Sequence, residues 1–282
     1  TWTRGSAGSS RTTPSALTTR GLGADGISID FGSRGNSVTN NTVITHGTSS
    51  ASIKDTGIST NVTRNYVFAH GFAGYGIYLF GADGIVLSNA ITTTGTGAVG
   101  IDGDGGSGRY NFTSNVINTS HSSAYGIQLS TPNNTFANNN ITTNAHSIRI
   151  DSAGASNNIL ISNIINNTNP GTSSDLHFGI AGINGTTLID QPIGRYVFTT
   201  MGGTVKIRRT GIGEINFTQA INGSGTNLSS DISIASNNAT VNSSKATLNR
   251  TATILLYGIP TNLVNAGIRR DGTSCGSICT NL

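Results

Sequence analysis

The sequence predicts an all-β protein: a parallel β-helix of about six to seven coils, followed by a β-sandwich-like or capping β-module. Three observations predict this fold. One asparagine recurs at a nearly constant interval in the pattern apolar-x-x-Asn-x-apolar. Each interval contains two short apolar pieces with the alternation of a half-buried strand. Gly, Ser, Asn, Thr and Asp, which favour turns, separate these pieces. A fixed period of this length indicates a solenoid, a propeller or another repeat array.

The recurring asparagines are separated by 24, 24, 26, 24 and 24 residues. Stacked coils lie about 4.8 Å apart, so a side-chain amide can hydrogen-bond its own turn and the amides of the next coils. Asparagine also tolerates the left-handed backbone of a sharp turn. We therefore expect an internal structural ladder, and the longer third step predicts a loop over residues 103–109. The ladder residues are Asn41, Asn65, Asn89, Asn115, Asn139 and Asn163.

The second apolar piece of each period lies nine to eleven residues before the asparagine and often begins with Gly-Ile, as at Gly76-Ile77, Gly100-Ile101 and Gly126-Ile127. Two or three short strands with turns in about 24 residues make one coil of a parallel β-helix. A four-stranded propeller blade needs roughly 40 residues. No useful length of the chain shows helical spacing.

These asparagine-bearing, Gly-Ile-punctuated repeats resemble those of the pectate-lyase-like superfamily of right-handed parallel β-helices, including NosD-type periplasmic and archaeal cell-surface proteins. The resemblance covers about half of the chain. It implies the architecture, but the superfamily contains lyases, hydrolases, epimerases and non-catalytic surface proteins, so it leaves the activity open.

The repeats divide the chain into three parts. Residues 1–25 form a polar N-terminal arm, residues 26–190 the β-helix, and residues 191–282 a C-terminal β-module of irregularly spaced strands. Two roles are open for the arm. It either pairs with an open sheet edge of another copy, giving a head-to-tail homo-oligomer or filament, or folds back as a cap on its own first coil.

The compartment is predicted from glycosylation sequons, which lie on the surface of exported proteins. Fourteen Asn-x-Ser/Thr acceptors occur, and none is a ladder asparagine. Compositional bias toward Asn and Thr is the alternative explanation. We expect an extracellular or cell-surface glycoprotein, with acceptors at Asn40, Asn61, Asn111, Asn118, Asn133, Asn140, Asn166, Asn184, Asn216, Asn222, Asn227, Asn238, Asn242 and Asn249.

The two cysteines, Cys275 and Cys279, are separated by three residues near the C-terminus. A zinc site needs four ligands, and a redox motif has two intervening residues. We expect a small local disulfide, as in other exported proteins.

An outward row on one β-helix sheet is the candidate site. The positions after the Gly-Ile pairs predict a row of Asp30, Lys54, Tyr78, Asp102, Gln128, Arg149 and His177. Lys54, Tyr78, Asp102, Gln128 and Arg149 are the candidate glycan-binding residues. An enzyme using this face would rely on Asp102, Asp104, Tyr78 and Arg149 for proton transfer and charge neutralisation.

The segment Asp102-Gly-Asp104 resembles the start of a calcium loop, but Thr113 occupies the position of the required glutamate. A glycosidase needs two carboxyls roughly 5–9.5 Å apart, which Asp102 and Asp104 could provide. We predict no metal and no cofactor.

Two hypotheses follow. The first is a non-catalytic extracellular structural protein that assembles with copies of itself. The second is a polysaccharide-active enzyme or glycan-binding adhesin. Charged residues are only 10% of the chain, with no basic cluster interleaved with aromatics, so nucleic-acid binding is not expected. No apolar run is long enough to span a membrane.

Overall fold

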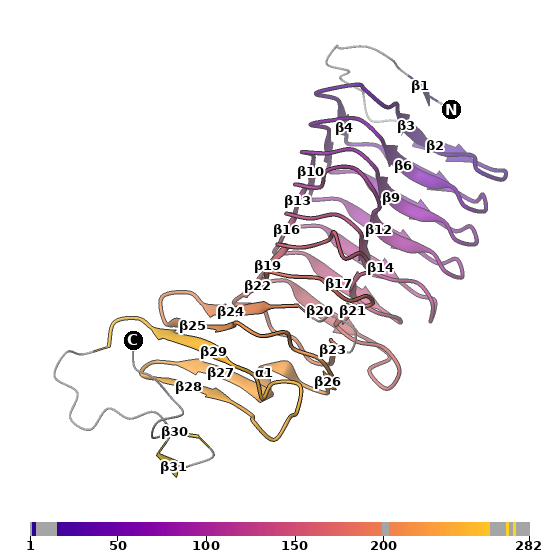
Figure 1. The fold of residues 1–282 in the computed structure, drawn as a ribbon. Helices are drawn as coiled ribbons and strands as arrows, with labels where there is room; N and C mark the ends of the chain where they lie inside the picture. The colour runs from indigo at the N-terminus through magenta and orange to yellow at the C-terminus, as the bar shows by residue number, and fades with distance from the viewer. Residues whose placement is uncertain (1, 4–15, 199–202, 260–268, 271–272, 275–282) are drawn as a thin grey trace.

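The computed structural model describes residues 2–3, 16–198, 203–259, 269–270 and 273–274. These residues form a β-solenoid of about eight coils that continues into a C-terminal β-module (Figure 1). Three parallel sheets, here called sheets 1, 2 and 3, form the sides of the solenoid, and most coils pass through them in that order. The predicted fold class is therefore confirmed.

Sheet 1 contains ten strands, of which β1 to β23 are parallel and β26 is antiparallel. They are β1 (Trp2–Thr3), β3 (Ile27–Ile29), β6 (Ala51–Asp55), β9 (Tyr75–Leu79), β12 (Val99–Gly103), β15 (Ile127–Leu129), β18 (Ile148–Ile150), β21 (Leu176–Phe178), β23 (Tyr196–Val197) and β26 (Ser224–Gly225).

Sheet 2 also has ten strands and runs along the whole described molecule. They are β4 (Ser37–Thr39), β7 (Asn61–Thr63), β10 (Ile85–Leu87), β13 (Asn111–Thr113), β16 (Thr135–Ala137), β19 (Ile159–Ile161), β22 (Thr186–Ile189), β24 (Val205–Arg209), β25 (Gly213–Phe217) and β29 (Ala252–Leu256).

Sheet 3 has seven parallel strands. They are β2 (Ala16–Thr19), β5 (Thr42–Thr45), β8 (Tyr66–Ala69), β11 (Ala90–Thr93), β14 (Val116–Thr119), β17 (Asn140–Thr143) and β20 (Ile164–Asn167).

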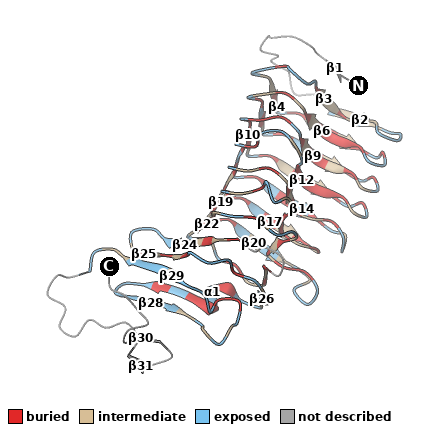
Figure 2. Ribbon diagram, viewed as in Figure 1, coloured by how far each residue is buried: buried red, intermediate tan, exposed pale blue. Residues whose placement is uncertain are grey.

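Most strands contribute one or two buried apolar side chains to the interior, and Figure 2 shows buried residues along the coils of the solenoid. Ile53, Ile77 and Ile101 stack in sheet 1 with no exposed surface. In sheet 2, Phe112 and Phe136 stack with ring centroids 4.5 Å apart. Because neighbouring strands pair in register, each apolar residue lies on the equivalent residue of the next coil.

The asparagine ladder lies at the corner between sheets 2 and 3. All six side chains are buried, and each Nδ2 donates to the Oδ1 of the next asparagine at 2.8–3.1 Å. Gln191 continues the column, since its Oε1 accepts from the Nδ2 of Asn163 at 2.7 Å. The left-handed backbone falls on the residue before each ladder asparagine, with φ of 48–59°, at Asn40, Arg64, Ser88, Ser114, Asn138 and Ser162.

A second, shorter ladder lies at the corner between sheets 1 and 2. The backbone N–H of Tyr110 donates to Asn134 Oδ1 at 2.9 Å, and Asn134 Nδ2 donates to Asn158 Oδ1 at 3.0 Å. The repeated Gly-Ile pattern also has a structural cause. A Cβ on Gly100 would lie 2.5 Å from the carbonyl oxygen of Gly126 in the next coil, so only glycine fits there.

The solenoid begins earlier than the predicted boundary at residue 26. β2 pairs in parallel with β5, and β1 pairs in parallel with β3, so the described parts of residues 1–25 belong to the chain's own first coils. The expected loop after β12 is present, with positive φ at Gly105, Gly106 and Gly108.

The solenoid also continues beyond residue 190, because β24 pairs in parallel with β22. β25 and β29 then extend sheet 2 in antiparallel orientation. The short helix α1 (Leu228–Asp231) and the hairpin of β27 (Ile232–Ala235) and β28 (Asn238–Val241) place Leu228, Ile232 and Ile234 in the solenoid's own core cluster. The module is therefore a cap that shares the solenoid core. A last pair, β30 (Arg269–Arg270) and β31 (Thr273–Ser274), is antiparallel.

Candidate functional site

The outward row of sheet 1 is continuous over seven coils. The strand register aligns Lys54 with Tyr78, Tyr78 with Asp102, and Asp102 with Gln128. Arg149 and His177 follow in the next two coils. The row begins at Ser28, which pairs with Lys54. Asp30 was predicted there and is wrong, because it lies two positions after Ser28, beyond the end of β3.

Asp102 is the buried carboxyl of this row. Its side chain is 5% exposed, and its Oδ1 has no hydrogen-bond partner among the described residues. Burial, followed by the negative charges of Asp104 and Asp151, raises the pKa of Asp102 from 3.8 to about 7. The exposed Asp104 follows it by two residues. The carboxyl of Asp102 is therefore poised to hold a proton near neutral pH.

Replacing Asp102 by asparagine is expected to stabilise the protein at pH 8 and to have little effect near pH 4. The folded-state pKa lies above the unfolded one, so the favourable contribution of this carboxyl is complete below pH 3.8 and lost as the pH rises through about 7. At about 1.4 kcal/mol per pKa unit, the gain has an upper bound of about 4 kcal/mol. Urea denaturation of parent and variant between pH 4 and 8 measures it.

The matched control for this experiment is Asp104→Asn, since Asp104 is exposed two residues away. Its stability should follow that of the parent much more closely. Parallel pH profiles of the parent and Asp102→Asn would show that the Asp102 carboxyl is not buried as the geometry indicates.

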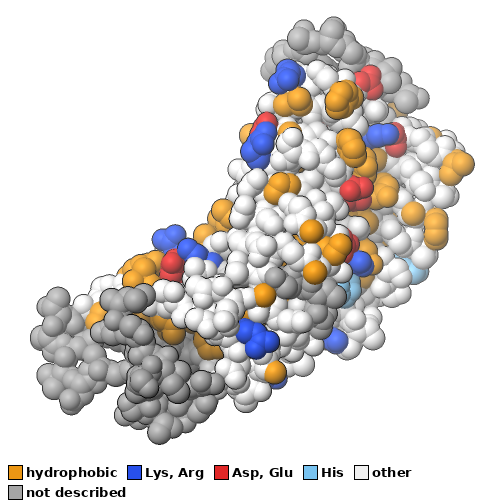
Figure 3. Space-filling view, viewed as in Figure 1, with side chains coloured by type: hydrophobic (Ala, Val, Ile, Leu, Met, Phe, Trp, Pro, Cys, Tyr) orange, Lys and Arg blue, Asp and Glu red, His pale blue; other side chains and the backbone are white. Residues whose placement is uncertain are grey.

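The cationic side chains near this row are already paired. Arg149 Nε lies 2.5 Å from Asp151 Oδ2, and the Arg149 guanidinium also donates to the hydroxyl of Tyr125 and lies 4.7 Å from its ring centroid. Lys54 Nζ lies 3.6 Å from Asp25 Oδ2. Neither cation is among the causes of the pKa shift of Asp102. In Figure 3 most of the visible surface is uncharged, and the few acidic and basic side chains lie in small groups.

Tyr78 and His177 are two further ionisable residues of this row. Burial, followed by the charges of Asp104 and Asp102, raises the pKa of Tyr78 to about 12, so its hydroxyl keeps its proton. Burial lowers the pKa of His177, whose ring stacks on that of His146 at 4.1 Å between centroids. The row thus combines a protonated phenol, a protonatable carboxyl and an imidazole whose pKa is lowered, but its arginine is paired with Asp151.

The sequon positions separate cleanly from the ladder. Thirteen of the fourteen acceptor asparagines are exposed, and only Asn216 is partly buried, whereas all six ladder asparagines are buried. Burial therefore does not prevent a modifying enzyme from reaching the exposed acceptors.

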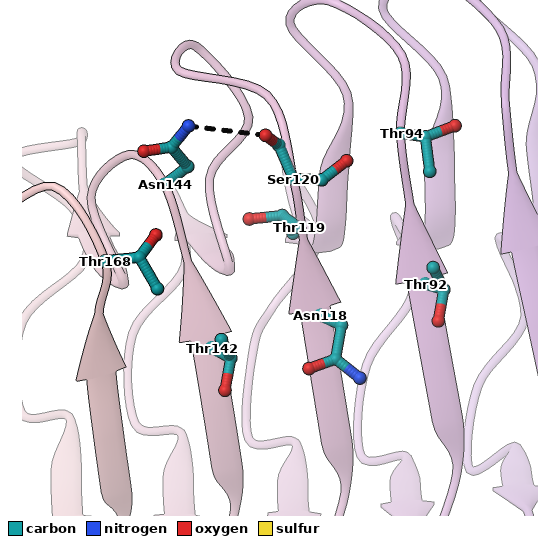
Figure 4. Close-up of a pocket in the computed structure, with 8 residues that line it drawn as sticks. All are labelled: Thr92, Thr94, Asn118, Thr119, Ser120, Thr142, Asn144 and Thr168. Atoms are coloured by element: carbon teal, nitrogen blue, oxygen red, sulfur yellow. Dashed lines mark hydrogen bonds between the residues drawn. The ribbon is translucent and has the colours of Figure 1, made fainter.

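A shallow depression of ≈ 300 Å³ lies on the outer face of sheet 3. Sequence reasoning missed it, because its residues are the same Thr, Ser and Asn that favour turns elsewhere in the chain. Only the strand register shows that they form rows. The lining residues are Thr92, Thr94, Asn118, Thr119, Ser120, Thr142, Asn144 and Thr168 (Figure 4).

The described residues contain no group of three or more His, Cys, Asp or Glu side chains that could hold a metal ion. His46 stacks on His70 with centroids 4.9 Å apart, as His146 does on His177. Imidazole nitrogens bind metals in the ring plane, so lone pairs of stacked rings do not converge on one ion.

Cys275, Cys279 and their predicted disulfide lie outside the described residues. No helix in the described part of the chain is long and apolar enough to cross a membrane.

Residues 10–189, well over half of the chain, match the model of the family described as "Periplasmic copper-binding protein (NosD)". No curated protein and no solved structure matches this chain. The copper in that description does not fit the side chains described above. The described histidines are dispersed or stacked in pairs, and they form no group of three or more possible metal ligands with other described His, Cys, Asp or Glu side chains.

Proposed function

This chain belongs to the NosD family of parallel β-helix proteins, and from that membership and its geometry we propose that it is an exported, non-catalytic structural protein whose copies join end to end at the cell surface. Three supports come from different parts of the molecule. They are the family's description as periplasmic, the paired charges on sheet 1, and the two ends of sheet 2.

A location outside the cytoplasm is supported by the thirteen exposed sequon asparagines as well as by the family description. Glycosylated sequons are typical of the surface of exported proteins. A low content of charged residues, 10% of the chain, suits a protein whose polar surface consists mainly of hydroxyls and amides. Attached glycans would then supply much of the surface's hydration.

A non-catalytic role is supported by the partners of the ionisable groups on sheet 1. Neutralising a uronate, as a lyase or epimerase must, requires a free cation beside the reacting carboxylate. Arg149 is held by Asp151 and Tyr125, and Lys54 is held by Asp25. The alternative, a polysaccharide-active enzyme, is favoured by one observation: the pKa of about 7 at Asp102, two residues from the exposed Asp104. Two carboxyls in different environments are what an acid and base pair requires.

The observation that carries the assembly proposal is the exposure of β29 at one end of sheet 2. β29 has β25 on one side and no strand on the other side among the described residues, and β4 is the edge strand at the opposite end of the sheet. Ile254 and Leu255, on opposite faces of β29, are 46% and 48% exposed. A strand edge with exposed apolar side chains favours pairing with another chain.

Joining the β29 end of one copy to the β4 end of the next would be a heterologous contact, which repeats without closing and gives a filament. The N-terminal segment is the weaker candidate for this link. β1 and β2 pair with the chain's own β3 and β5. Of the two roles that the sequence leaves open for this segment, the pairing supports that of a cap on the first coil.

Replacing Ile254 by proline is expected to abolish this assembly while leaving the fold intact. Tyr257 N donates to Ile212 O, and Thr251 O accepts from Thr218 N. Alternate residues of an antiparallel strand face opposite sides, so the N–H of Ile254 faces the free edge. Proline removes that donor without breaking a bond to β25. Light scattering over a range of protein concentrations should show a rising mass for the parent and a constant monomer mass for the variant.

Ile254→Val is the matched control, because it keeps both the edge N–H and a β-branched apolar side chain; it should assemble like the parent. A parent that stays monomeric at all concentrations, or a proline variant that assembles equally well, would contradict the proposed contact. Turnover of a polyuronate or neutral glycan that is lost in Asp102→Asn would contradict the non-catalytic role.

A further inference from the structure

The outer face of sheet 3 carries two straight rows of side chains, all of them polar except Phe68. The register aligns Phe68, Thr92, Asn118, Thr142 and Asn166, one from each coil. The second row lies two residues further along the chain, just past the end of each strand, and contains His70, Thr94, Ser120, Asn144 and Thr168. Figure 4 shows that the middle members of both rows line one depression. They are Thr92, Asn118 and Thr142 of the first row and Thr94, Ser120, Asn144 and Thr168 of the second.

The groups in the centre of this face are available to a ligand. Asn144 Nδ2 donates weakly to Ser120 O at 3.4 Å, and Thr168 Oγ1 donates to Thr143 O at 2.9 Å. Thr92, Asn118 and Thr142 show no side-chain hydrogen bond within the described part of the chain. A hydroxyl and a carboxamide each donate and accept, so the centre offers both functions at every coil.

Aromatic rings extend the face at the N-terminal end of the depression. Tyr66, which is 51% exposed, contacts Phe68 at 4.6 Å between ring centroids. Phe68 stacks with His70, whose Nδ1 lies 2.9 Å from the hydroxyl of Thr94 in the second row. The aromatic patch and the polar rows are therefore continuous. Aromatic side chains offer a large apolar contact area beside polar groups.

This combination matches the chemistry of a sugar chain. A pyranose ring has apolar C–H faces that lie on aromatic rings and hydroxyl groups at its edge that pair with hydroxyls and amides. The lining of the depression has no charged side chain, so it offers no cation to neutralise an anionic polymer. The depression is open rather than enclosing, unlike a site for an isolated small molecule.

We propose that the outer face of sheet 3, from β8 to β20, binds one strand of an uncharged linear polysaccharide lying along the solenoid axis. One side chain of each row recurs about every 4.8 Å along that axis, so a repeating polymer meets the same donors and acceptors at each coil. The site is independent of the proposed end-to-end assembly and of the ionisable row on sheet 1.

Glycosylation bears directly on this site, because Asn118 and Asn166 are sequon acceptors within the first row. A glycan on Asn118 would occupy the depression. The site therefore requires these two asparagines to be unmodified, and the protein for the experiment is prepared in a bacterial host that does not glycosylate sequons.

The experiment is affinity electrophoresis of the full chain in native gels that contain soluble galactomannan, soluble mixed-linkage β-glucan or polygalacturonate. The test variant is Thr142→Arg, which places a long charged side chain in the middle of the depression. The control is Thr135→Arg, a similarly half-buried threonine of the same coil that faces outward from sheet 2. Thermal denaturation followed by circular dichroism checks that both variants remain folded.

The parent should be retarded by at least one of the two neutral polysaccharides and not by polygalacturonate. Thr142→Arg should weaken the apparent affinity by about tenfold or more, which is the scale of one or two lost hydrogen bonds, and Thr135→Arg should bind like the parent. Absence of retardation by both neutral polymers, retardation by polygalacturonate alone, or equal binding of the two arginine variants would each overturn the proposal.

Discussion

Replacing Asn139 by alanine is expected to lower the free energy of unfolding by on the order of 2–6 kcal/mol. The Asn139 Oδ1 accepts the backbone N–H of Asn115 at 2.9 Å, and its Nδ2 donates to the carbonyl of Phe112 at 2.9 Å. Alanine removes the partners of both buried backbone groups, and each unsatisfied group costs about 1–3 kcal/mol. The two ladder bonds to Asn115 and Asn163 are lost as well.

Asn140→Ala provides the matched control one residue away, because Asn140 is exposed at the start of β17. Surface substitutions of this kind usually change stability by less than about 0.5 kcal/mol. Urea denaturation of unglycosylated parent and variants measures both effects. Similar losses in the two variants would mean that the buried amide column does not stabilise the corner.

Replacing Phe112 by alanine is expected to cost about 3–5 kcal/mol, the range for removing a buried aromatic ring. Phe112 has no exposed surface and stacks on Phe136 with an angle of 6° between the rings. The coils on both sides are fixed by backbone pairing in three sheets, so the cavity cannot collapse easily. A cost near the upper end of the range is therefore expected.

Val116→Ala tests whether this loss is specific to the interior, because Val116 lies on β14 of the same coil and is 43% exposed. Its melting temperature should stay close to that of the parent, while that of Phe112→Ala falls by several degrees. If the two variants melted together, the stacked column of sheet 2 would not be the rigid core described above.

The solenoid could be predicted from the sequence because its period fixes both the strands and the ladder. The limits of this prediction lie where the period or the residue type changes. Gln191 continues the ladder after a step of 28 residues, from 163 to 191, and is not an asparagine. The second ladder has only Asn134 and Asn158, too short a series to stand out in a chain rich in asparagine.

The site was less predictable, because its properties depend on contacts between coils. The Gly-Ile pattern predicts most of the outward row, and applying it consistently gives Ser28 in place of Asp30. The burial of Asp102 and the pairing of Arg149 with Asp151 depend on how loops and neighbouring strands cover the row. The sequence does not show how deeply these side chains are buried. The rows on sheet 3 can be recognised only once the register between its strands is known.

The loop after β12 has a consequence for how such a protein can change its length. The coil that contains it is two residues longer, with a step of 26 residues from Asn89 to Asn115, yet β12 and β13 keep residue-for-residue pairing with the strands on both sides. Extra residues at that corner therefore leave the register unchanged. A tandem duplication of one whole 24-residue unit should likewise be absorbed, adding about 4.8 Å and one side chain to every row. Gene-level gain or loss of single coils would thus adjust the reach and the valency of the outer faces in unit steps, without a redesign of the core.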